Sequence, residues 1–284
     1  MITSLSNSND PPSLDEAAEE ARFLTEQGFA LRNAGSHKSA LEKFDQAIAC
    51  DASNAKTYLY RGQTFIQLQD YEAALQDFRS AIKLNPTEVR AWHGQGVARA
   101  ELGLYPSAVD SFDRALVYDQ DNAKILYNRG LALLRLSQYK QAFESFDQAV
   151  KRDSADHHIW YSLAIAQASM EQIQSAIDSL DQTIRLKPDC HYAWNYRGSL
   201  LNRLFQHQAA LESFEQSLKH RSPNANARYG IAVTYSLLDN PDAAAMHLQA
   251  AIQLNPAIYG LMARNDISFD TVRNHPKVRA ILAS

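Results

Sequence analysis

Small and apolar residues recur along this chain of 284 residues at a fixed interval of 34 positions. When units are counted from Ala21, the twentieth residue is always alanine, the eighth is glycine or alanine, and the twenty-fourth is phenylalanine or leucine. Such a period indicates stacked repeats and not a single globular core. The seven units span residues 21–54, 55–88, 89–122, 123–156, 157–190, 191–224 and 225–258.

Within one unit the apolar pattern predicts two helices joined by a short turn. In the second unit Tyr58, Phe65 and Leu68 recur at helical spacing around Gly62, and residues 71–82 carry an apolar stripe with steps of three and four. The proline at position 86 ends the second helix, because proline disfavours helix in the preceding residue. Since helices approach closely only where side chains are small, the eighth and twentieth places are expected at the helix contact.

This pattern resembles the tetratricopeptide repeat family, and the resemblance extends over residues 21–258. The sequence Asn128-Arg129-Gly130 is typical of bacterial members. The resemblance implies an all-α fold, a right-handed α-solenoid of seven helix–turn–helix repeats with a terminal capping helix, in which the first helices line a concave groove. The residues that match the family are Tyr58, Trp92, Leu126, Trp160 and Trp194 at the fourth place, Tyr71, Tyr105 and Tyr139 between the helices, and Pro86, Pro188 and Pro256 at the end of a unit.

The two ends of the chain differ from the repeats. Residues 1–20 form a polar, acidic leader, in which residues 1–12 are expected to be disordered and Ser13 begins a capping box that predicts a helix from about residue 14. Residues 259–284 are expected to cover the apolar face of the seventh repeat, since repeat proteins need such caps for solubility. The apolar residues of this capping segment are Phe269, Val272, Val278 and Ile281.

Composition narrows the functions that the chain can have. The net charge is −4, and residues 1–20 contribute −5, so the repeats are nearly neutral and give no general argument for nucleic acid or an anionic membrane. Two cysteines imply no disulfide framework and favour a reducing compartment. The sequence has no apolar stretch of transmembrane length and no secretory signal, so a cytoplasmic protein without membrane insertion is expected.

Four consecutive units carry a cation at their second place. The resemblance implies that the second, fifth, sixth, ninth and twelfth places of each unit line the groove. The four cations lie at expected helix N-termini, where the helix dipole favours acids, so they oppose the local preference each time. They are either a surface for an acidic peptide segment or a set of solvated side chains. We call them the basic row: Arg22, Lys56, Arg90 and Lys124.

The later units carry tyrosines and amides at the groove places. Tyrosine offers rigid, amphipathic contact area of the kind found where peptides are recognised. The alternative is that Tyr127 and Tyr229 turn inward and pack between repeats. Together with the basic row, these residues suggest an extended ligand that is acidic at one end and apolar at the other. We call them the tyrosine set: Tyr127, Asn128, His158, Tyr161, Tyr192, Asn195, Tyr196 and Tyr229.

Arginine recurs at the seventh place of alternate units, at Arg61, Arg129 and Arg197. We expect a structural role, in which each arginine pairs with acids on second helices. The candidate partners are Asp77, Asp113, Asp147 and Glu215.

The sequence contains no catalytic, cofactor-binding or phosphate-binding motif. His157, His158, Cys190 and His191 are zinc ligands by type, but equivalent residues of neighbouring units are expected about 10 Å apart, too far to share an ion. The lysine and asparagine set with which one subfamily grips chaperone tails is incomplete in every triple of units.

We therefore interpret the chain as a non-catalytic adaptor or scaffold, without a cofactor or metal, that binds a protein or peptide in its groove. Two alternatives stay open. One is an assembly factor for a membrane complex, such as a photosynthetic one, which the bacterial character permits. The other is an RNA-binding helical repeat protein, which the near-neutral charge disfavours.

Overall fold

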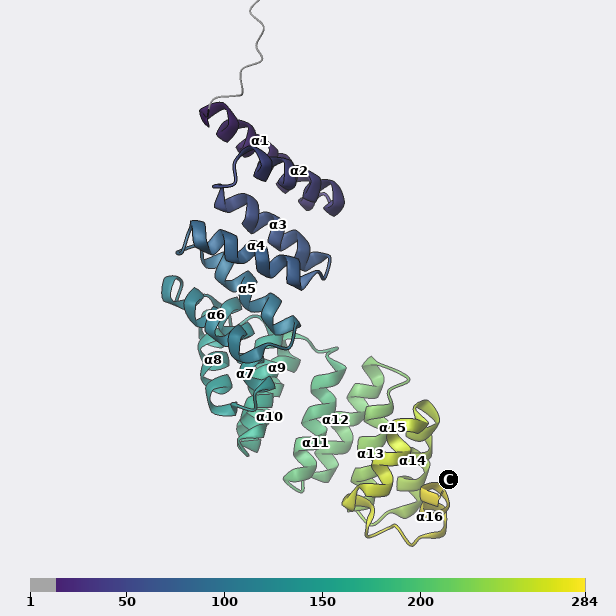
Figure 1. Cartoon of the computed structure of the whole chain (residues 1–284). Helices are drawn as coiled ribbons and strands as arrows, with labels where there is room; N and C mark the ends of the chain where they lie inside the picture. Colours follow the sequence, from purple (N-terminus) through teal and green to yellow (C-terminus); the bar gives the residue numbers. More distant parts are fainter. Residues whose placement is uncertain (1–13, 284) are drawn as a thin grey trace, which may run out of the picture. The chain divides into compact units, whose positions relative to one another are not determined.

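The computed structural model describes residues 14–283, and in this range the chain forms sixteen α-helices and one 3-10 helix, with no strand (Figure 1). The first helices of the repeat units are α1 (Leu14–Asn33), α3 (Ala55–Gln67), α5 (Val89–Glu101), α7 (Ala123–Arg135), α9 (His157–Ser169), α11 (His191–Arg203) and α13 (Ala225–Leu237). The second helices are α2 (His37–Cys50), α4 (Tyr71–Leu84), α6 (Tyr105–Tyr118), α8 (Tyr139–Arg152), α10 (Ile173–Leu186), α12 (His207–His220) and α14 (Pro241–Leu254).

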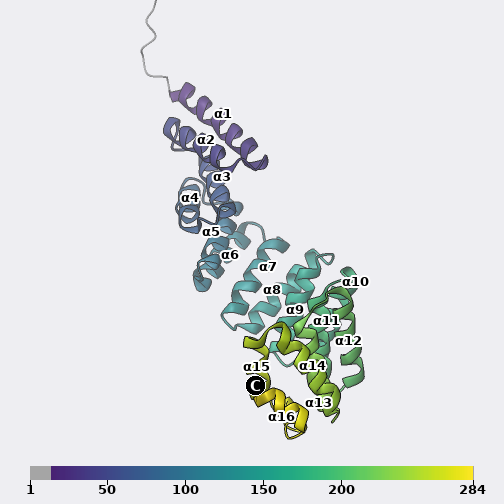
Figure 2. The same ribbon diagram turned by 90° about the vertical axis from the view of Figure 1, so that its right-hand side faces the viewer.

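Two compact units make up the chain, Met1–Ser137 and Gln138–Ser284. In the first unit each helix from α1 to α7 contacts the next one along the chain, as both views show (Figure 1 and Figure 2). In the second unit the same is true from α8 to α14. This all-α repeat fold confirms the fold class that the 34-residue period predicts.

Polar caps and tryptophans define the junctions between repeats. The side chain of Asn54 accepts a hydrogen bond from the backbone N–H of Lys56, which satisfies one of the donors left open at the start of α3. Trp92, at the fourth place, donates its indole N–H to the carbonyl of Pro86 at 2.8 Å and so ties the helix to the turn that precedes it. The same bond joins Trp160 to Ser154 and Trp194 to Pro188.

The core of each repeat depends on a matched pair of residues at the eighth and twenty-fourth places. A Cβ atom added at Gly96 would lie only 2.5 Å from the ring of Phe112, which is completely buried. In the fifth and seventh repeats alanine occupies the eighth place, and there the twenty-fourth place holds the smaller leucine. The two positions therefore conserve their combined volume, as close packing demands. The two exchanged pairs are Ala164 with Leu180 and Ala232 with Leu248.

The turn between the two helices of a unit places its fifteenth residue in the left-handed backbone region. Glycine adopts this region without steric cost, whereas other residues do so at a cost of about 1–2 kcal/mol. Only two units use glycine here, and the bulkiest substitute is Phe205, whose side chain is 82% exposed. The residues are Gly35, Gln69, Gly103, Ser137, Glu171, Phe205 and Asp239.

Three further elements follow the last repeat: α15 (Pro256–Asn265), the 3-10 helix η1 (Ile267–Phe269) and α16 (Pro276–Ala283). Phe269, Val272 and Val278 are buried in one apolar cluster with residues of α13 and α14. At the other end α1 begins at Leu14, and the expected disorder of residues 1–12 and the expected cap at Ser13 lie outside the described residues. None of the helices that the structure describes is both long and apolar enough to cross a membrane.

Candidate functional site

The second compact unit, Gln138–Ser284, contains a pocket of about 620 Å³. Its lining comes mainly from the first helices of the repeats and from the segment after the last repeat. Helices α9, α11 and α13 supply most of its lining, Phe214 of α12 contributes as well, and α15 with the segment up to Ser268 supplies the rest. The pocket gathers five members of the tyrosine set: Tyr161, Tyr192, Asn195, Tyr196 and Tyr229. The residues of the capping segment that complete it include Tyr259, Met262 and Asp266.

Three tyrosine rings pack together on one side of this pocket. Tyr161 lies edge-on to Tyr192, with 4.7 Å between ring centroids, and 6.2 Å from Tyr196. Burial raises the pKa of Tyr161 to about 12, with Tyr196 contributing, and burial also raises the pKa of Tyr196. The hydroxyls of Tyr161 and Tyr196 are therefore protonated at neutral pH. They combine an apolar ring surface with a hydrogen-bond donor, as an amphipathic peptide requires.

Two asparagines of α11 face the pocket in different states. Asn202 is buried and satisfied: its amide donates to the hydroxyl of Thr234 at 2.8 Å, and its carbonyl lies 3.1 Å from Nδ1 of His207. The carbonyl oxygen of Asn195 is covered, yet no donor among residues 14–283 reaches it. A covered acceptor without a donor costs free energy unless a ligand supplies one. Because the protein covers this oxygen, the Asn195 side chain would have to rotate before a bound molecule could donate to it.

Tyr229 turns inward and forms a wall of the pocket, so its ring is not an exposed contact. It is 7% exposed, and its hydroxyl donates to Asp266 at 2.8 Å. Burial and this bond raise its pKa. Tyr259 of α15 packs against it with 5.4 Å between ring centroids, and the hydroxyl of Tyr259 donates to Asn226. The inward orientation is one of the two alternatives that the sequence leaves open.

The other members of the tyrosine set do not line this pocket. Asn128, in α7 of the first unit, donates its amide to Nε2 of His93 at 2.8 Å. Burial, with the nearby charge of Lys124, lowers the pKa of His93 to about 4, so its ring is neutral and can accept this bond. Tyr127 of the same helix is half-buried, and His158 is exposed at the start of α9 in the second unit.

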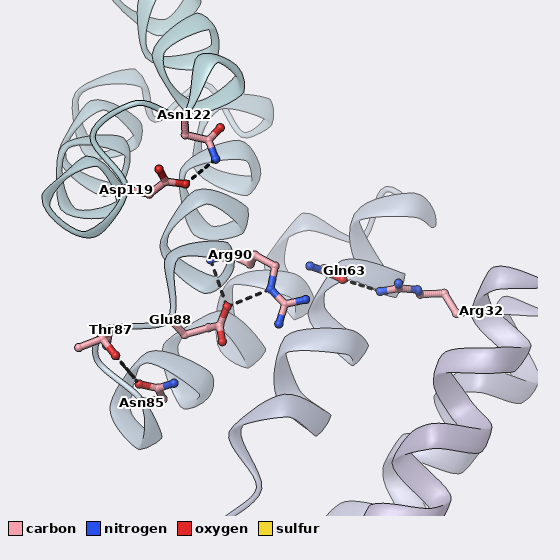
Figure 3. A network of polar contacts seen from close by, with 8 residues as sticks. All are labelled: Arg32, Gln63, Asn85, Thr87, Glu88, Arg90, Asp119 and Asn122. Atoms are coloured by element: carbon pink, nitrogen blue, oxygen red, sulfur yellow. Dashed lines mark hydrogen bonds and ion pairs between the residues drawn. The ribbon is translucent and has the colours of Figure 1, made fainter. Parts of the chain in front are cut away.

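The basic row is exposed in the first unit, but acids accompany part of it. Arg22 and Lys56 line one cavity of about 490 Å³, together with Asp51 and Tyr60. Hydrogen bonds from Ser53 lower the pKa of Asp51, and the charge of Arg22 adds to the effect. Arg90 pairs with the carboxylate of Glu88 at 3.0 Å (Figure 3). Glu26 also lines the cavity, so its two cations are balanced by two acids.

Two groove residues of the first unit were missed by the sequence reasoning. Arg32, at the twelfth place of its unit, donates to the side chain of Gln63, as Figure 3 shows. Tyr60 lies beside it, with the Arg32 guanidinium carbon 5.4 Å from its ring centroid and that of Arg90 at 5.8 Å. The sequence could have indicated Tyr60 as a groove residue, because it holds the same sixth place in its repeat as Tyr196.

The arginines at the seventh place pair with acids of second helices. Arg61 makes two bonds to Asp77, at 2.6 and 2.8 Å, and Arg129 pairs with Asp113 at 2.6 Å, so both predicted partners are confirmed. Each of the three arginines pairs with the acid that lies sixteen residues before it, on the second helix of the preceding repeat. For Arg61 this pair is additional to the one with Asp77. These pairs are Arg61 with Asp45, Arg129 with Asp113 and Arg197 with Asp181. They connect neighbouring repeats on the side of the second helices.

One group of possible metal ligands lies at the start of α9. Ligand atoms of Asp156, His157 and His158 are all within 4.8 Å of one another. The Asp156 carboxylate already caps the helix, since it accepts the backbone N–H of His158 at 2.8 Å. A cation at this position would also face the positive end of the helix dipole. The capping role accounts for the acid, and the arrangement gives no reason to assign a metal to it.

Comparison with known families identifies two repeat models in the sequence. A model described as tetratricopeptide repeat matches residues 59–124, 99–157, 127–169 and 203–257, together more than half of the chain. A model described as protein prenyltransferase alpha subunit repeat matches residues 173–204. No curated protein matches the sequence.

Solved structures similar to the chain are helical repeat proteins. The C-terminal part of a TPR repeat-containing protein from Cytophaga hutchinsonii has a TM-score of 0.66 and 16% identity, and the match covers 89% of this chain and 98% of that one. PilF from Pseudomonas aeruginosa has a TM-score of 0.61 and 18% identity, with 78% and 96% covered. YrrB, a TPR protein described as having an unusual peptide-binding site, has a TM-score of 0.59 and 21% identity, with 65% and 95% covered. At these identities the likeness shows the fold alone.

Proposed function

The chain belongs to the tetratricopeptide repeat family, and from this premise we propose that it is a non-catalytic adaptor that binds a partner protein on the surface of its first helices. The family and fold are those of protein-interaction scaffolds. The finer proposal concerns which residues bind: the tyrosine pocket of the second unit and the basic row of the first. The similarity to YrrB, whose peptide-binding site is noted above, supports a peptide segment as the ligand.

The observation that carries the proposal is the pocket that Tyr161, Tyr192 and Tyr196 line together with Asn195. An extended peptide offers an apolar side chain for the rings and a backbone N–H for the Asn195 oxygen once that side chain rotates. The pocket volume of about 620 Å³ lies within the usual range for ligand sites. We propose that it receives an apolar residue of the partner, with Asn195 holding the adjacent backbone.

In the first unit the basic row supports binding of an acidic partner segment. All four side chains are exposed, and complementary charge contributes more to the rate of association and to specificity than to affinity. We also propose a cytoplasmic location, since the two cysteines of the sequence imply no disulfide framework.

Affinity capture with the full chain from native extract, followed by mass spectrometry, tests the proposal and identifies the partner. We expect the double change Tyr161→Ala and Tyr196→Ala to abolish recovery of a partner that binds the pocket, since tyrosine anchors contribute about 2 kcal/mol or more each at interfaces. The matched control is Tyr118→Ala, which removes an exposed tyrosine from a second helix.

The basic row is tested by changing Arg22, Lys56, Arg90 and Lys124 to glutamate. The control changes four exposed cations of second helices, Lys38, Arg79, Arg114 and Lys140, in the same way. Reduced recovery in the first variant but not in the second supports the row. Equal recovery from both variants would reject it.

A further inference from the structure

Arg32 of α1 is a half-buried cation without an acid beside it. Its guanidinium donates to Gln63 and, at 3.3 Å, to Asn33, and both acceptors are neutral amides. None of the ion pairs among residues 14–283 includes Arg32. Burial, with the charge of Arg90 contributing, lowers the pKa of Arg32. A partly buried cation of this kind carries a desolvation cost that a counter-charge would offset.

Aromatic rings hold Arg32 in place. Its guanidinium carbon lies 4.8 Å from the ring centroid of Phe29 and 5.4 Å from that of Tyr60, both within the range of cation–π attraction. The Phe29 and Tyr60 rings themselves pack at 4.7 Å. The arginine is thus preorganised on a rigid aromatic base and does not move freely in solvent.

A second guanidinium approaches the same tyrosine from α5. Arg90 lies 5.8 Å from the Tyr60 ring and uses its Nε to bond Glu88. Glu88 and Tyr60 are both hydrogen-bonding neighbours of its guanidinium group, and both raise the pKa of Arg90. Figure 3 shows the side chains of Arg90 and Arg32 extending toward Gln63 from different helices. Three helices therefore bring two guanidinium groups and one amide to a single place.

The charge balance of this cluster indicates the ligand. Glu88 neutralises Arg90 in part and is the main cause of the raised pKa of Arg90, whereas Arg32 is uncompensated. About one positive charge is left over, which matches a singly charged carboxylate better than a phosphate with its charge of nearly −2. Planar guanidinium groups also match the geometry of a carboxylate.

We propose that Arg32, Arg90 and Gln63 form a carboxylate seat on Tyr60, which receives one acidic group of the partner. The inference rests on the proposed adaptor function and deepens it by naming a recognition element, because Arg32 is not part of the basic row. The adjoining cavity gives room for the residues next to that carboxylate, and its lining includes Arg22, Lys56 and Tyr60 as well as the acids Glu26 and Asp51. The carboxylate is supplied by an acidic side chain or by a chain terminus.

Fluorescence polarisation with labelled peptides tests the seat in the full chain. The probes are octaglutamate with an amidated end, which offers only side-chain carboxylates, and octaglutamine with a free end, which offers only the terminus. We expect one of them to bind at about 0.15 M salt and Arg32→Gln to weaken it by about tenfold or more, as for charged hydrogen bonds. Arg114→Gln, on the exposed face of α6, is the matched control and should change binding less than about twofold.

Arg90→Gln is a second test that does not disturb a buried group, because Arg90 is exposed. It should also weaken the bound probe by about tenfold, and the double variant should lose little more, since both residues hold one carboxylate. Circular dichroism confirms that each variant is folded. Binding of neither probe, or equal effects of Arg32→Gln, Arg90→Gln and Arg114→Gln, would overturn the seat. Partner capture through the tyrosine pocket would stand or fall separately, since its variants lie in the other unit.

Discussion

At the scale of single residues, the fold is specified by volume and by backbone geometry at a few fixed places. The eighth place must be glycine where a phenylalanine packs against it, because a single methyl group at Gly96 would overlap the Phe112 ring. It becomes alanine where leucine replaces phenylalanine. The sequence shows both exchanges, yet only the distances reveal that they compensate each other.

We predict that Gly96→Ala destabilises the protein by about 1–2 kcal/mol, because overpacking outweighs the better helix propensity of alanine. The double variant with Phe112→Leu should be more stable, by at least about 1 kcal/mol, than the summed effects of the two single changes predict. It recreates the Ala164–Leu180 pair of the fifth repeat. Denaturant unfolding of the two single variants and the double variant measures this coupling. The control is Gly260→Ala, where the nearest atom to the new methyl would be 3.6 Å away. Simple additivity of the two changes would contradict the pairing.

A second prediction at this scale concerns the left-handed turn position. Phe205 adopts a φ of 58° with its side chain exposed, so Phe205→Gly should stabilise the protein by about 1 kcal/mol by relieving strain. Gly103→Ala, at a φ of 75° with no atom within 4 Å of the new methyl, should destabilise it by a similar amount. Thermal unfolding compares both variants with the parent. A lower melting temperature for Phe205→Gly would show that its ring contributes a contact that outweighs the strain.

At the scale of helices, the 34-residue period predicts the elements almost completely. From α3 to α13 each first helix begins at the residue from which its unit is counted, because a polar cap precedes it in most units. The period could not predict how the last pocket is closed. Tyr259, Met262 and Asp266 lie after the repeats, so no periodic place indicated their contact with Tyr229.

In the first compact unit, the sequence pattern does not predict that Arg32, Tyr60 and Arg90 come together. Arg32, Tyr60 and Arg90 come from the twelfth, sixth and second places of three successive repeats. The family resemblance assigns each of these places to the groove. Whether the three side chains meet depends on the offset and rotation between neighbouring first helices. The cations at the second place of four consecutive units were visible as a pattern, whereas a single arginine at a twelfth place was not.

The contact between α5 and α7 carries a prediction for pH dependence. His93 accepts the Asn128 amide, and its pKa is lowered to about 4 from an ordinary value near 6.5. Between these values the unfolded chain binds a proton that the folded chain does not, so the free energy of unfolding should fall as pH drops from about 6.5 to 4. Because His93 is partly exposed, we expect a loss of about 1–2 kcal/mol.

Denaturant unfolding at pH 7 and pH 5 measures this effect, with His93→Gln as the comparison. The difference between the parent and this variant isolates His93 from the other histidines whose pKa values are lowered, His157, His191 and His247. If the two proteins lose the same stability on acidification, the charge of His93 does not contribute.

At the scale of the whole molecule, two units built from the same repeat carry different surfaces. The first presents cations of α1, α3, α5 and α7, and the second presents tyrosines of α9 and α11 closed off by α15. In a repeat protein each repeat contributes to stability through its neighbours, so groove residues can change without loss of the fold. The arginine–acid pairs that connect successive repeats join a first helix to the second helix of the preceding repeat, α3 to α2 and α11 to α10.

Hydrogen exchange of the full chain, with and without the captured partner, tests most directly whether first helices bind it. We expect slower exchange in α9, α11 and α15 around the tyrosine pocket, with little change in α10, α12 and α14. Protection confined to those second helices, or none at all at a saturating partner concentration, would contradict it.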